Sequence, residues 1–192
     1  MTSFLFLAQG FEEIEALTTV DVMRRAGMAV RTVSITDSHK VEGAHGITVT
    51  ADLTFKEADF GDAEWLICPG GMPGAEHLHD FAPLNDLLRV HAMHPGKIAA
   101  ICAAPAVVLA QIGLLDGLEA TCYPGFEALA KKYGAIIVDK RVVAGKHLIT
   151  ANGPSSATAF ALAIVANSLG EHHARQIAGD MLLYPGTTPF YF

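Results

Sequence analysis

Cys102 is the residue of this sequence with the clearest capacity for chemistry, because of the residues on either side of it. An apolar run from Ile98 to Ile101 precedes the cysteine, and Pro105 opens an apolar, helix-like segment after it. The immediate neighbours are alanines, and a sharp strand-to-helix turn requires such small side chains. A turn of this kind holds its apex residue in a strained conformation facing a cleft. The pattern predicts a nucleophile-elbow cysteine at Cys102, with a buried, inert thiol as the alternative.

The helix expected after Cys102 bears on the ionisation of its thiol. Pro105 suits the first turn of a helix, where a missing N–H costs nothing. The N-terminus of a helix carries partial positive charge, which stabilises a thiolate and lowers the pKa of a nearby cysteine. We therefore expect Cys102 to have a lowered pKa and to be more reactive than Cys68 and Cys122.

The elements that must position Cys102 alternate between strand and helix. Predicted strands are Ser3 to Ala8, Ala29 to Ile35, Trp65 to Cys68 and Ile98 to Ile101. Predicted helices are Glu12 to Ala26, Pro83 to His94, the segment after Pro105, Pro124 to Tyr133, a long apolar helix to Leu169, and Glu171 to Leu183. Short glycine-rich joints separate them. This alternation predicts a doubly wound α/β fold, with a mostly parallel sheet and helices on both faces.

Two shorter pieces complete the expected organisation. The glycine-rich stretch Val41 to Val49 is predicted to be an extended pair outside the main sheet, and Gly145-Lys146 marks a hairpin between Val142–Ala144 and His147–Thr150. No linker or internal repeat divides the chain. Residues 1–192 are therefore predicted to form a single domain, with about 184–192 as a C-terminal tail.

Glycines and the cysteine follow the predicted strands at places where a ligand would bind. Gly10, Gly70-Gly71 and Cys102 each come directly after a strand or one residue beyond it. In doubly wound sheets, ligands bind beyond the carboxyl ends of the strands, where the strand order reverses. We therefore expect these residues to face one cleft.

Composition limits the classes of partner. The chain is 51% hydrophobic and 17% charged, and its net charge of −7 argues against nucleic acid or an anionic membrane as the partner. No apolar run has membrane-spanning length, and the first residues do not resemble a signal peptide. Three cysteines without metal-binding spacing are typical of a reducing compartment, so we predict a cytoplasmic protein.

No cofactor is indicated by the motifs present. The glycines of Pro69–Gly74 lack the spacing of a phosphate- or dinucleotide-binding loop. His91 and His94 lie three residues apart on a predicted helix, but no third ligand accompanies them in the sequence, and zinc needs three or four. We predict neither a metal nor an organic cofactor.

Four separated segments of the sequence resemble the ThiJ/PfpI superfamily, and they occur in that family's order. They are LAQGFEEIEALTTVDVMRRAG, CPGGMPGAEHL, AAICAAPAVVLA and ITANGPSSATAFALAIV. Within the superfamily the match is to the branch of the Parkinson-disease-associated protein deglycase and its bacterial relatives, over the chain up to about Leu183. The resemblance implies a flavodoxin-like fold, a homodimer with part of the first helix in the contact, and an oxidation-sensitive cysteine.

The resemblance also implies roles for individual residues. The cysteine falls on Cys102, and the acid that hydrogen-bonds it falls on Glu15. From the residues alone, Glu12, Glu13 and Glu15 are equal candidates, since all three suit the start of a helix. The family's oxyanion-binding backbone amides fall on Gly71 and Ala103. The remaining pocket positions fall on Gly70, Tyr123, Pro124 and Pro154.

Two departures from the family's patterns affect the mechanism. Many relatives carry a histidine just before a proline after the elbow helix, and Tyr123 stands at that position. A phenol, with a reference pKa of about 10, is a poor base at neutral pH. Ala103 stands where peptidase-like members place a histidine. A cysteine peptidase or amidase is therefore disfavoured.

Two function classes remain, and they use the same cysteine. The first is a cofactor-independent enzyme that converts 2-oxoaldehydes such as methylglyoxal, or their early glycation adducts, to 2-hydroxy acids through Cys102 and Glu15. The second is a non-enzymatic sensor of oxidative stress, or a redox-regulated chaperone, in which Cys102 is oxidised. The sequence favours the first but does not separate them.

Overall fold

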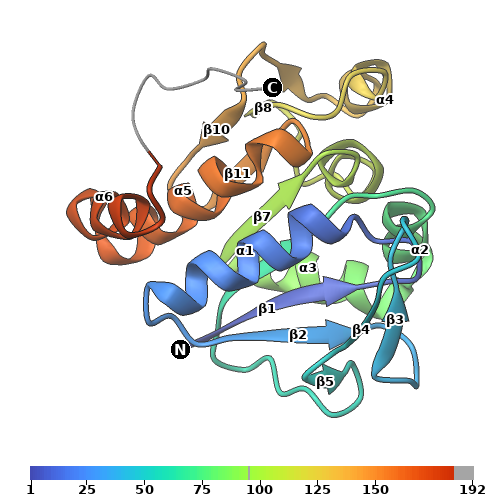
Figure 1. Ribbon diagram of the computed structural model, residues 1–192. Helices are drawn as coiled ribbons and strands as arrows, with labels where there is room; N and C mark the ends of the chain where they lie inside the picture. The colour runs from blue at the N-terminus through green and yellow to red at the C-terminus, as the bar shows by residue number, and fades with distance from the viewer. Residues whose placement is uncertain (95, 184–192) are drawn as a thin grey trace.

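A computed structural model describes residues 1–94 and 96–183 (Figure 1). Its centre is a seven-stranded sheet in the order β10-β11-β7-β6-β1-β2-β5. The strands of this sheet are β1 (Thr2–Leu7), β2 (Val30–Ser34), β5 (Leu53–Thr54), β6 (Ala63–Cys68), β7 (Lys97–Ile101), β10 (Val142–Ala144) and β11 (Leu148–Ala151). Every neighbouring pair is parallel except β10 and β11. The prediction of a flavodoxin-like, mostly parallel α/β sheet is confirmed.

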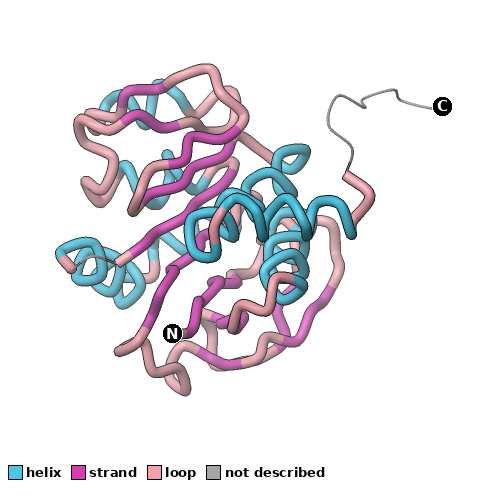
Figure 2. The backbone as a smooth tube through the Cα atoms, turned by 90° about the vertical axis from the view of Figure 1, so that its left-hand side faces the viewer, coloured by secondary structure: helices cyan, strands magenta, loops and turns pink. Residues whose placement is uncertain are grey.

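Helices cover both faces of this sheet, as Figure 2 shows from the side. The helical segments are α1 (Glu13–Arg25), α2 (Gly74–Asp80), α3 (Ala82–Met93), η1 (Pro105–Ala110), α4 (Glu127–Lys132), η2 (Pro154–Ser156), α5 (Ala157–Leu169) and α6 (Glu171–Asp180). One face packs against α1 and α5, with α6 against α5. The other packs against α2, α3 and η1.

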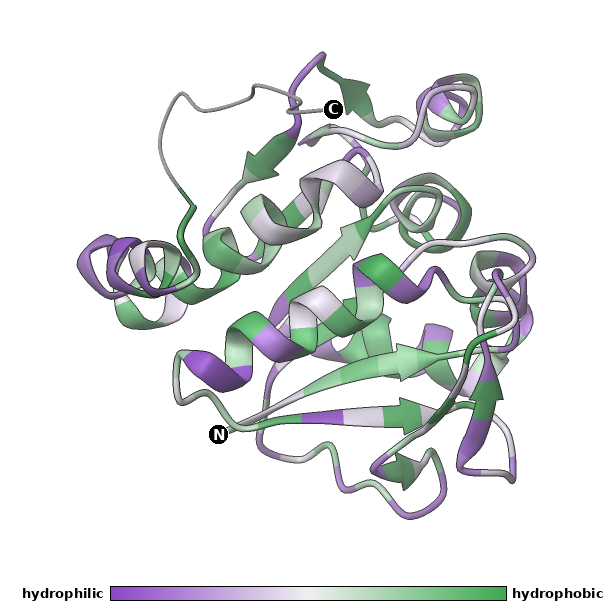
Figure 3. Ribbon diagram, in the orientation of Figure 1, coloured by the Kyte–Doolittle hydropathy of each residue, from purple (hydrophilic) through white to green (hydrophobic). Residues whose placement is uncertain are grey.

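The central strand β1 is buried on both sides, which explains its continuous apolar sequence. Leu5 and Leu7 belong to the core beneath α1 and α5, whereas Phe4 and Phe6 belong to the core beneath α3. Successive side chains of a strand point to opposite faces, so a strand covered on both faces needs apolar residues throughout. Figure 3 shows hydrophobic residues along the central strands and hydrophilic residues on the outer side of α6.

The excursion after β2 forms a separate antiparallel pair, as predicted. Its strands are β3 (Lys40–Glu42) and β4 (Thr48–Thr50). Phe11 forms an isolated parallel bridge with Gly43, and the N–H of Ala44 donates to the Phe11 carbonyl at 2.8 Å. These bonds hold the β3–β4 loop against the start of α1, at the carboxyl end of the sheet. A second small sheet pairs β8 (Glu119–Ala120) with β9 (Ile136–Ile137).

Several predicted boundaries differ from the structure. Helix α2 was not predicted, because its glycine-rich start looks like loop sequence. The segment after Pro105 is a turn of π-helix, and α4 begins at Glu127 instead of Pro124, because Gly125 has a φ of +100°. The β10–β11 hairpin has three loop residues, closed by the Gly145 N–H on the Leu148 carbonyl. Helix α6 ends at Asp180.

The predicted tail, 184–192, lies outside the described residues, and the prediction of a single domain over 1–192 stays a prediction. Within residues 1–94 and 96–183, no helix has the combination of length and apolar character that crossing a bilayer requires.

Candidate active site

Cys102 occupies a sharp turn between β7 and the helical segment that follows. Its φ is +66°, a region that residues with a side chain seldom adopt. The Cys102 N–H donates to the Ala151 carbonyl at 2.9 Å, and the Cys102 carbonyl accepts from the Tyr123 N–H at 2.8 Å. The surrounding chain therefore holds a conformation that costs energy, as is common at functional sites. The side chain is presented at the carboxyl end of the sheet.

Glu15 is a fully buried carboxyl group on the first turn of α1. Its Oε2 accepts the Gly70 N–H at 2.8 Å. Its Oε1 is buried and has no hydrogen-bond partner among the described residues. An unpartnered buried carboxylate oxygen is costly, and a proton on it would convert the group from an acceptor into a donor. The environment therefore favours a protonated Glu15.

Gly70 permits the close approach of Glu15 and Cys102. A Cβ at this position would lie 2.8 Å from Glu15 Oε2 and 3.0 Å from Cys102 Sγ. No side chain larger than hydrogen fits between the two groups. Gly71 has a φ of +88°, and its amide, together with that of Ala103, is directed at the Cys102 sulfur.

The ionisations of Glu15 and Cys102 are linked. Burial raises the pKa of Glu15 to about 7, against the opposing effect of the Gly70 and Cys102 hydrogen bonds. Burial, and after it the Glu15 charge, raise the pKa of the Cys102 thiol to about 12, although the Gly71 and Ala103 amides act in the opposite direction. Each negative charge disfavours the other, so the two protons leave in separate steps. Near neutral pH the pair passes to a state with one proton and one negative charge.

The expectation that a helix N-terminus lowers the pKa of Cys102 is therefore wrong. The thiol is desolvated and faces a carboxyl group, and these effects outweigh the local amides. Burial also raises the pKa of Cys68 to about 12 and that of Cys122 to about 11. Among the three, Cys102 is distinguished by access and by Glu15 as a proton acceptor, because it alone lines the cavity described below.

Alkylation should report this linkage. We expect iodoacetamide to modify Cys102 before Cys68 and Cys122, at a rate that rises as the pH passes upward through about 7. Below that pH both protons are bound, whereas above it Glu15 is ionised and can accept the Cys102 proton, which makes a minor thiolate form accessible to the reagent. Peptide mass spectrometry over a pH series measures the rate at each cysteine. Preferential modification of Cys68 would contradict the assignment.

A cavity of about 420 Å³ opens over Cys102 at the carboxyl end of the sheet. Its lining residues are Glu12, Ile14, His45, Gly71, Met72, Cys102, Ala103, Tyr123, Phe126 and Pro154. The structure thus brings Cys102, Gly71, Ala103, Tyr123 and Pro154 together. Glu15 and Gly70 lie in contact with Cys102 without lining the cavity.

Besides Gly70, two further expected positions, Pro124 and Gly10, do not line the cavity. Pro124 is exposed and follows Tyr123 outside the lining set. Gly10 also lies outside it; its carbonyl accepts the Gly74 N–H at 3.2 Å, which ties the turn after β1 to that after β6. Gly10 therefore helps build the cleft without facing it.

Sequence reasoning missed five lining residues: Glu12, Ile14, His45, Met72 and Phe126. Glu12 was only one of three equivalent acids. His45 lies in the β3–β4 loop, more than fifty residues from Cys102, and no motif connects it to the cysteine. The hydrogen bond from the Ala44 N–H to the Phe11 carbonyl brings this loop to the site.

His45 is bound to the start of α1 through Glu13. The His45 N–H donates to Glu13 Oε1 at 2.8 Å, and Nδ1 lies 2.9 Å from Glu13 Oε2 and 3.5 Å from Glu12 Oε2. The hydrogen bond to Glu13, and after it the charge of Glu12, raise the pKa of His45. Burial acts to raise the pKa of Glu13, but the hydrogen bonds from His45 and the nearby amides outweigh it. The pKa of Glu13 therefore lies below its usual value.

Glu12, Glu13 and His45 are the one set of described residues whose ligand atoms lie close enough to share a metal ion, within 4.8 Å. Both Glu13 oxygens already accept hydrogen bonds, from His45 and Ile47. We therefore treat the set as an ion-pair network.

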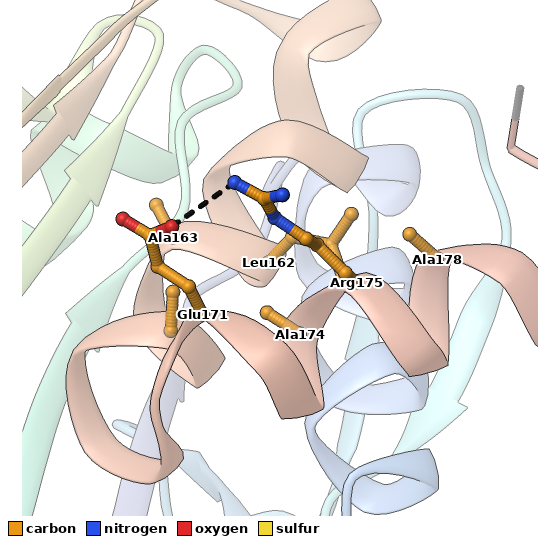
Figure 4. Close-up of a pocket in the computed structure, with 7 residues that line it drawn as sticks. Leu162, Ala163, Glu171, Ala174, Arg175 and Ala178 are labelled. Atoms are coloured by element: carbon orange, nitrogen blue, oxygen red, sulfur yellow. Dashed lines mark hydrogen bonds and ion pairs between the residues drawn. The ribbon is translucent and has the colours of Figure 1, made fainter. Parts of the chain in front are cut away.

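A second cavity, of about 410 Å³, lies between α5 and α6 (Figure 4). Leu162 and several alanines line it, and Glu171 and Arg175 form an ion pair of 3.1 Å at its edge. None of its lining residues lines the Cys102 cavity. It contains no nucleophile and no buried charged group, so it offers no comparable chemistry.

Comparison with known proteins places the chain in a family. Residues 2–167 match the DJ-1/PfpI family. The chain belongs to that family. The resemblance to the ThiJ/PfpI superfamily is thereby confirmed over most of the chain. DJ-1/PfpI membership accounts for the fold and for the segments that surround Cys102.

Relatives in the DJ-1/PfpI family support this placement along the length of the chain. Protein DJ-1 homolog B of Arabidopsis thaliana is 34% identical over 93% of this chain, which spans 41% of that protein's length. Glutathione-independent glyoxalase DJR-1.2 of Caenorhabditis elegans is 31% identical, with 90% of each chain covered. The solved structure of oxidized Toxoplasma gondii DJ-1 superposes with a TM-score of 0.89 at 36% identity, covering 94% of this chain and 97% of that one.

Proposed function

We propose that this protein is a cofactor-independent enzyme that converts 2-oxoaldehydes such as methylglyoxal, or their early glycation adducts, to 2-hydroxy acids. The observation that carries the proposal is the contact between Cys102, at a strained turn, and Glu15, whose pKa burial raises to about 7. A cysteine with an adjacent proton acceptor is the arrangement of an activated nucleophile. A carboxyl group that titrates near neutral pH suits proton transfer.

The first step is addition of sulfur to the aldehyde. Transfer of the Cys102 proton to Glu15 leaves a thiolate, which forms a C–S bond with the aldehyde carbon. The carbonyl electrons move to oxygen, where the Gly71 and Ala103 amides stabilise the negative charge. Glu15 returns its proton to this oxygen, giving a hemithioacetal and a free carboxylate.

The second step moves a proton between the two substrate carbons. The Glu15 carboxylate removes the proton from the carbon bound to sulfur, the electrons of the C–H bond form a C=C bond, and the ketone electrons move to their oxygen, giving an enediolate. Glu15 then gives the proton to the neighbouring carbon, and the hydroxyl proton on the first carbon passes to the oxygen of the second, so the enediolate becomes a thioester of the 2-hydroxy acid. Water cleaves the C–S bond to release the acid and regenerate Cys102. No oxidant or reductant is consumed, because the first substrate carbon is oxidised while the second is reduced.

The test is formation of lactate from methylglyoxal by the purified protein, in buffer without glutathione. We expect methylglyoxal loss and lactate gain in equal amounts, followed by proton NMR. The name of the C. elegans relative, a glutathione-independent glyoxalase, supports the choice of substrate. Absence of lactate at enzyme concentrations comparable to substrate would contradict the proposal.

A second candidate is oxidation sensing by the same cysteine. The observation favouring it is the pair of amides, Gly71 and Ala103, directed at the sulfur, which could bind the oxygens of a sulfinate, while a protonated Glu15 donates to it. Two equivalents of peroxide should then oxidise Cys102 through the sulfenic acid to the sulfinate and leave Cys68 unmodified. Peptide masses decide this. Catalytic lactate formation distinguishes the enzyme from a sensor.

The homodimer implied by the family resemblance stays a prediction. Ile14 and Leu17 are exposed apolar residues three apart on α1, so they share a face. We expect light scattering to give a dimer mass, and Leu17→Glu to shift it towards the monomer because a charge would be buried in the contact. Leu118→Glu, at a similarly exposed leucine before β8, is the control. A monomeric wild type would contradict the prediction.

A further inference from the structure

Release of the acid from Cys102 needs a base that the Cys102–Glu15 pair does not supply. Glu15 lies behind Cys102, where its contact with the sulfur suits proton transfers to and from atoms bound next to that sulfur, whereas a water molecule entering from solvent first meets the groups that line the cavity. Among the described residues that line the cavity, Glu12 carries a carboxylate and His45 an imidazole, and no other lining residue carries either group. The phenol of Tyr123 is a poor base at neutral pH, as argued above.

The geometry of His45 suits a base held in one orientation. Its Nδ1 faces Glu13 Oε2 at 2.9 Å, and its own N–H donates to Glu13 Oε1, so one carboxylate binds both ends of the residue. A carboxylate facing Nδ1 assigns the proton to that nitrogen, which leaves the lone pair on Nε2. Glu13 is itself buried and fixed by the Ile47 amide at 3.4 Å. A nucleophile, a histidine and an orienting carboxylate therefore occupy one site.

We propose that His45, oriented by Glu13, is the base that activates the water molecule releasing the 2-hydroxy acid from its thioester with Cys102. This inference rests on the proposed function. It names the residue for a step that the Cys102–Glu15 pair leaves open, and it gives the site the imidazole that Tyr123 does not provide. His45 reaches the cavity from the β3–β4 loop and not from the position of the family's histidine.

The atoms of the step balance without a further reactant. Nε2 of His45 takes a proton from water, and the resulting hydroxide forms a C–O bond with the thioester carbon. The carbonyl electrons move to oxygen, beside the Gly71 and Ala103 amides. Their return breaks the C–S bond, and the sulfur leaves as the thiolate. The imidazolium then returns its proton to the sulfur or to solvent.

The charges around His45 support this role. The titratable groups that face it are Glu12 and Glu13, both from the start of α1. Both raise the pKa of His45, the hydrogen bond to Glu13 contributing most. Two carboxylates therefore strengthen the base and stabilise the imidazolium that forms during the step.

The experiment is a comparison of His45→Asn with the wild type in acid-quenched reactions. Asparagine keeps an N–H donor near the position of Nδ1, so the contact with Glu13 survives, but it lacks Nε2. His39→Asn is the matched control, because His39 belongs to the same excursion, also faces a glutamate and lies outside the cavity. Denaturation after the quench lets the hemithioacetal dissociate, whereas the thioester stays on Cys102 and is removed by hydroxylamine.

We expect His45→Asn to turn over about two to four powers of ten more slowly, the usual scale for a lost general base, and to accumulate a hydroxylamine-sensitive adduct on Cys102. His39→Asn should match the wild type. Wild-type turnover in His45→Asn, or slow turnover without a thioester, would overturn the inference while leaving the proposed function intact. If the wild type makes no lactate, both the proposed function and the inference about His45 fail. Loss of wild-type activity on adding a chelator would show that Glu12, Glu13 and His45 bind a metal ion, and would overturn the role of His45 as a free base.

Discussion

Cys102→Ser should reduce the rate of lactate formation from methylglyoxal by roughly a thousandfold or more, the scale seen when a catalytic nucleophile is removed. Serine has nearly the same size and is expected to preserve the turn, whose φ of +66° is fixed by the bonds to Ala151 and Tyr123. The hydroxyl group, however, is far less acidic than a thiol, so Glu15 cannot generate a comparable nucleophile.

The control for this result is Cys122→Ala. Cys122 is buried and directly precedes Tyr123 in the sequence, but it does not line the cavity. Its replacement should cost stability through a small void and leave turnover unchanged. Rates are compared at equal folded fraction, checked by thermal unfolding. If activity survives in Cys102→Ser and is lost in Cys122→Ala, the assignment of Cys102 as the nucleophile is wrong.

Glu15→Gln should lower turnover by about two to four powers of ten while leaving Cys102 open to alkylation. Glutamine keeps an acceptor for the Gly70 N–H, which binds Glu15 Oε2 at 2.8 Å, so the fold around the site should persist. An amide cannot carry a proton between two carbons. In the wild type, kcat/KM should rise as the pH passes upward through about 7, because the pair must lose its first proton before sulfur can attack. That dependence should disappear from this range in Glu15→Gln.

Asp21→Asn provides a matched change on the same helix. Asp21 is exposed and pairs with Arg25 at 2.8 Å, an i,i+4 contact that contributes little to stability. Its amide variant should retain wild-type turnover and the same pH dependence. A Glu15→Gln variant with wild-type kcat, measured beside this control, would remove Glu15 from the mechanism.

The sequence predicted the parts of the fold that local patterns encode. The apolar run of β1 indicated a strand covered on both faces, and alternating elements indicated the parallel sheet. The turn at Cys102 was visible because small residues flank the cysteine. Helix α2 was missed because glycines at its start have low helix propensity, and contacts with η1 stabilise it instead.

The candidate site was predictable only where a motif or a family resemblance reached it. Glu15 could not be chosen over Glu12 and Glu13 from spacing, since all three are buried at the start of α1 for different reasons. His45 carried no signal, because its place depends on a loop bonded to Phe11. The pKa of Cys102 was predicted in the wrong direction, because burial and the facing carboxyl are tertiary effects that the local helix does not reveal.

The most direct test of the Cys102–Glu15 pair is lactate formation by the double variant Cys102→Ser, Glu15→Gln beside the two single variants. Residues that act as one unit give strongly non-additive losses, because either change alone already disables the unit. We therefore expect the double variant to be no slower than the slower single variant. Losses that multiply in the double variant would mean that the two residues act independently, and would contradict the account.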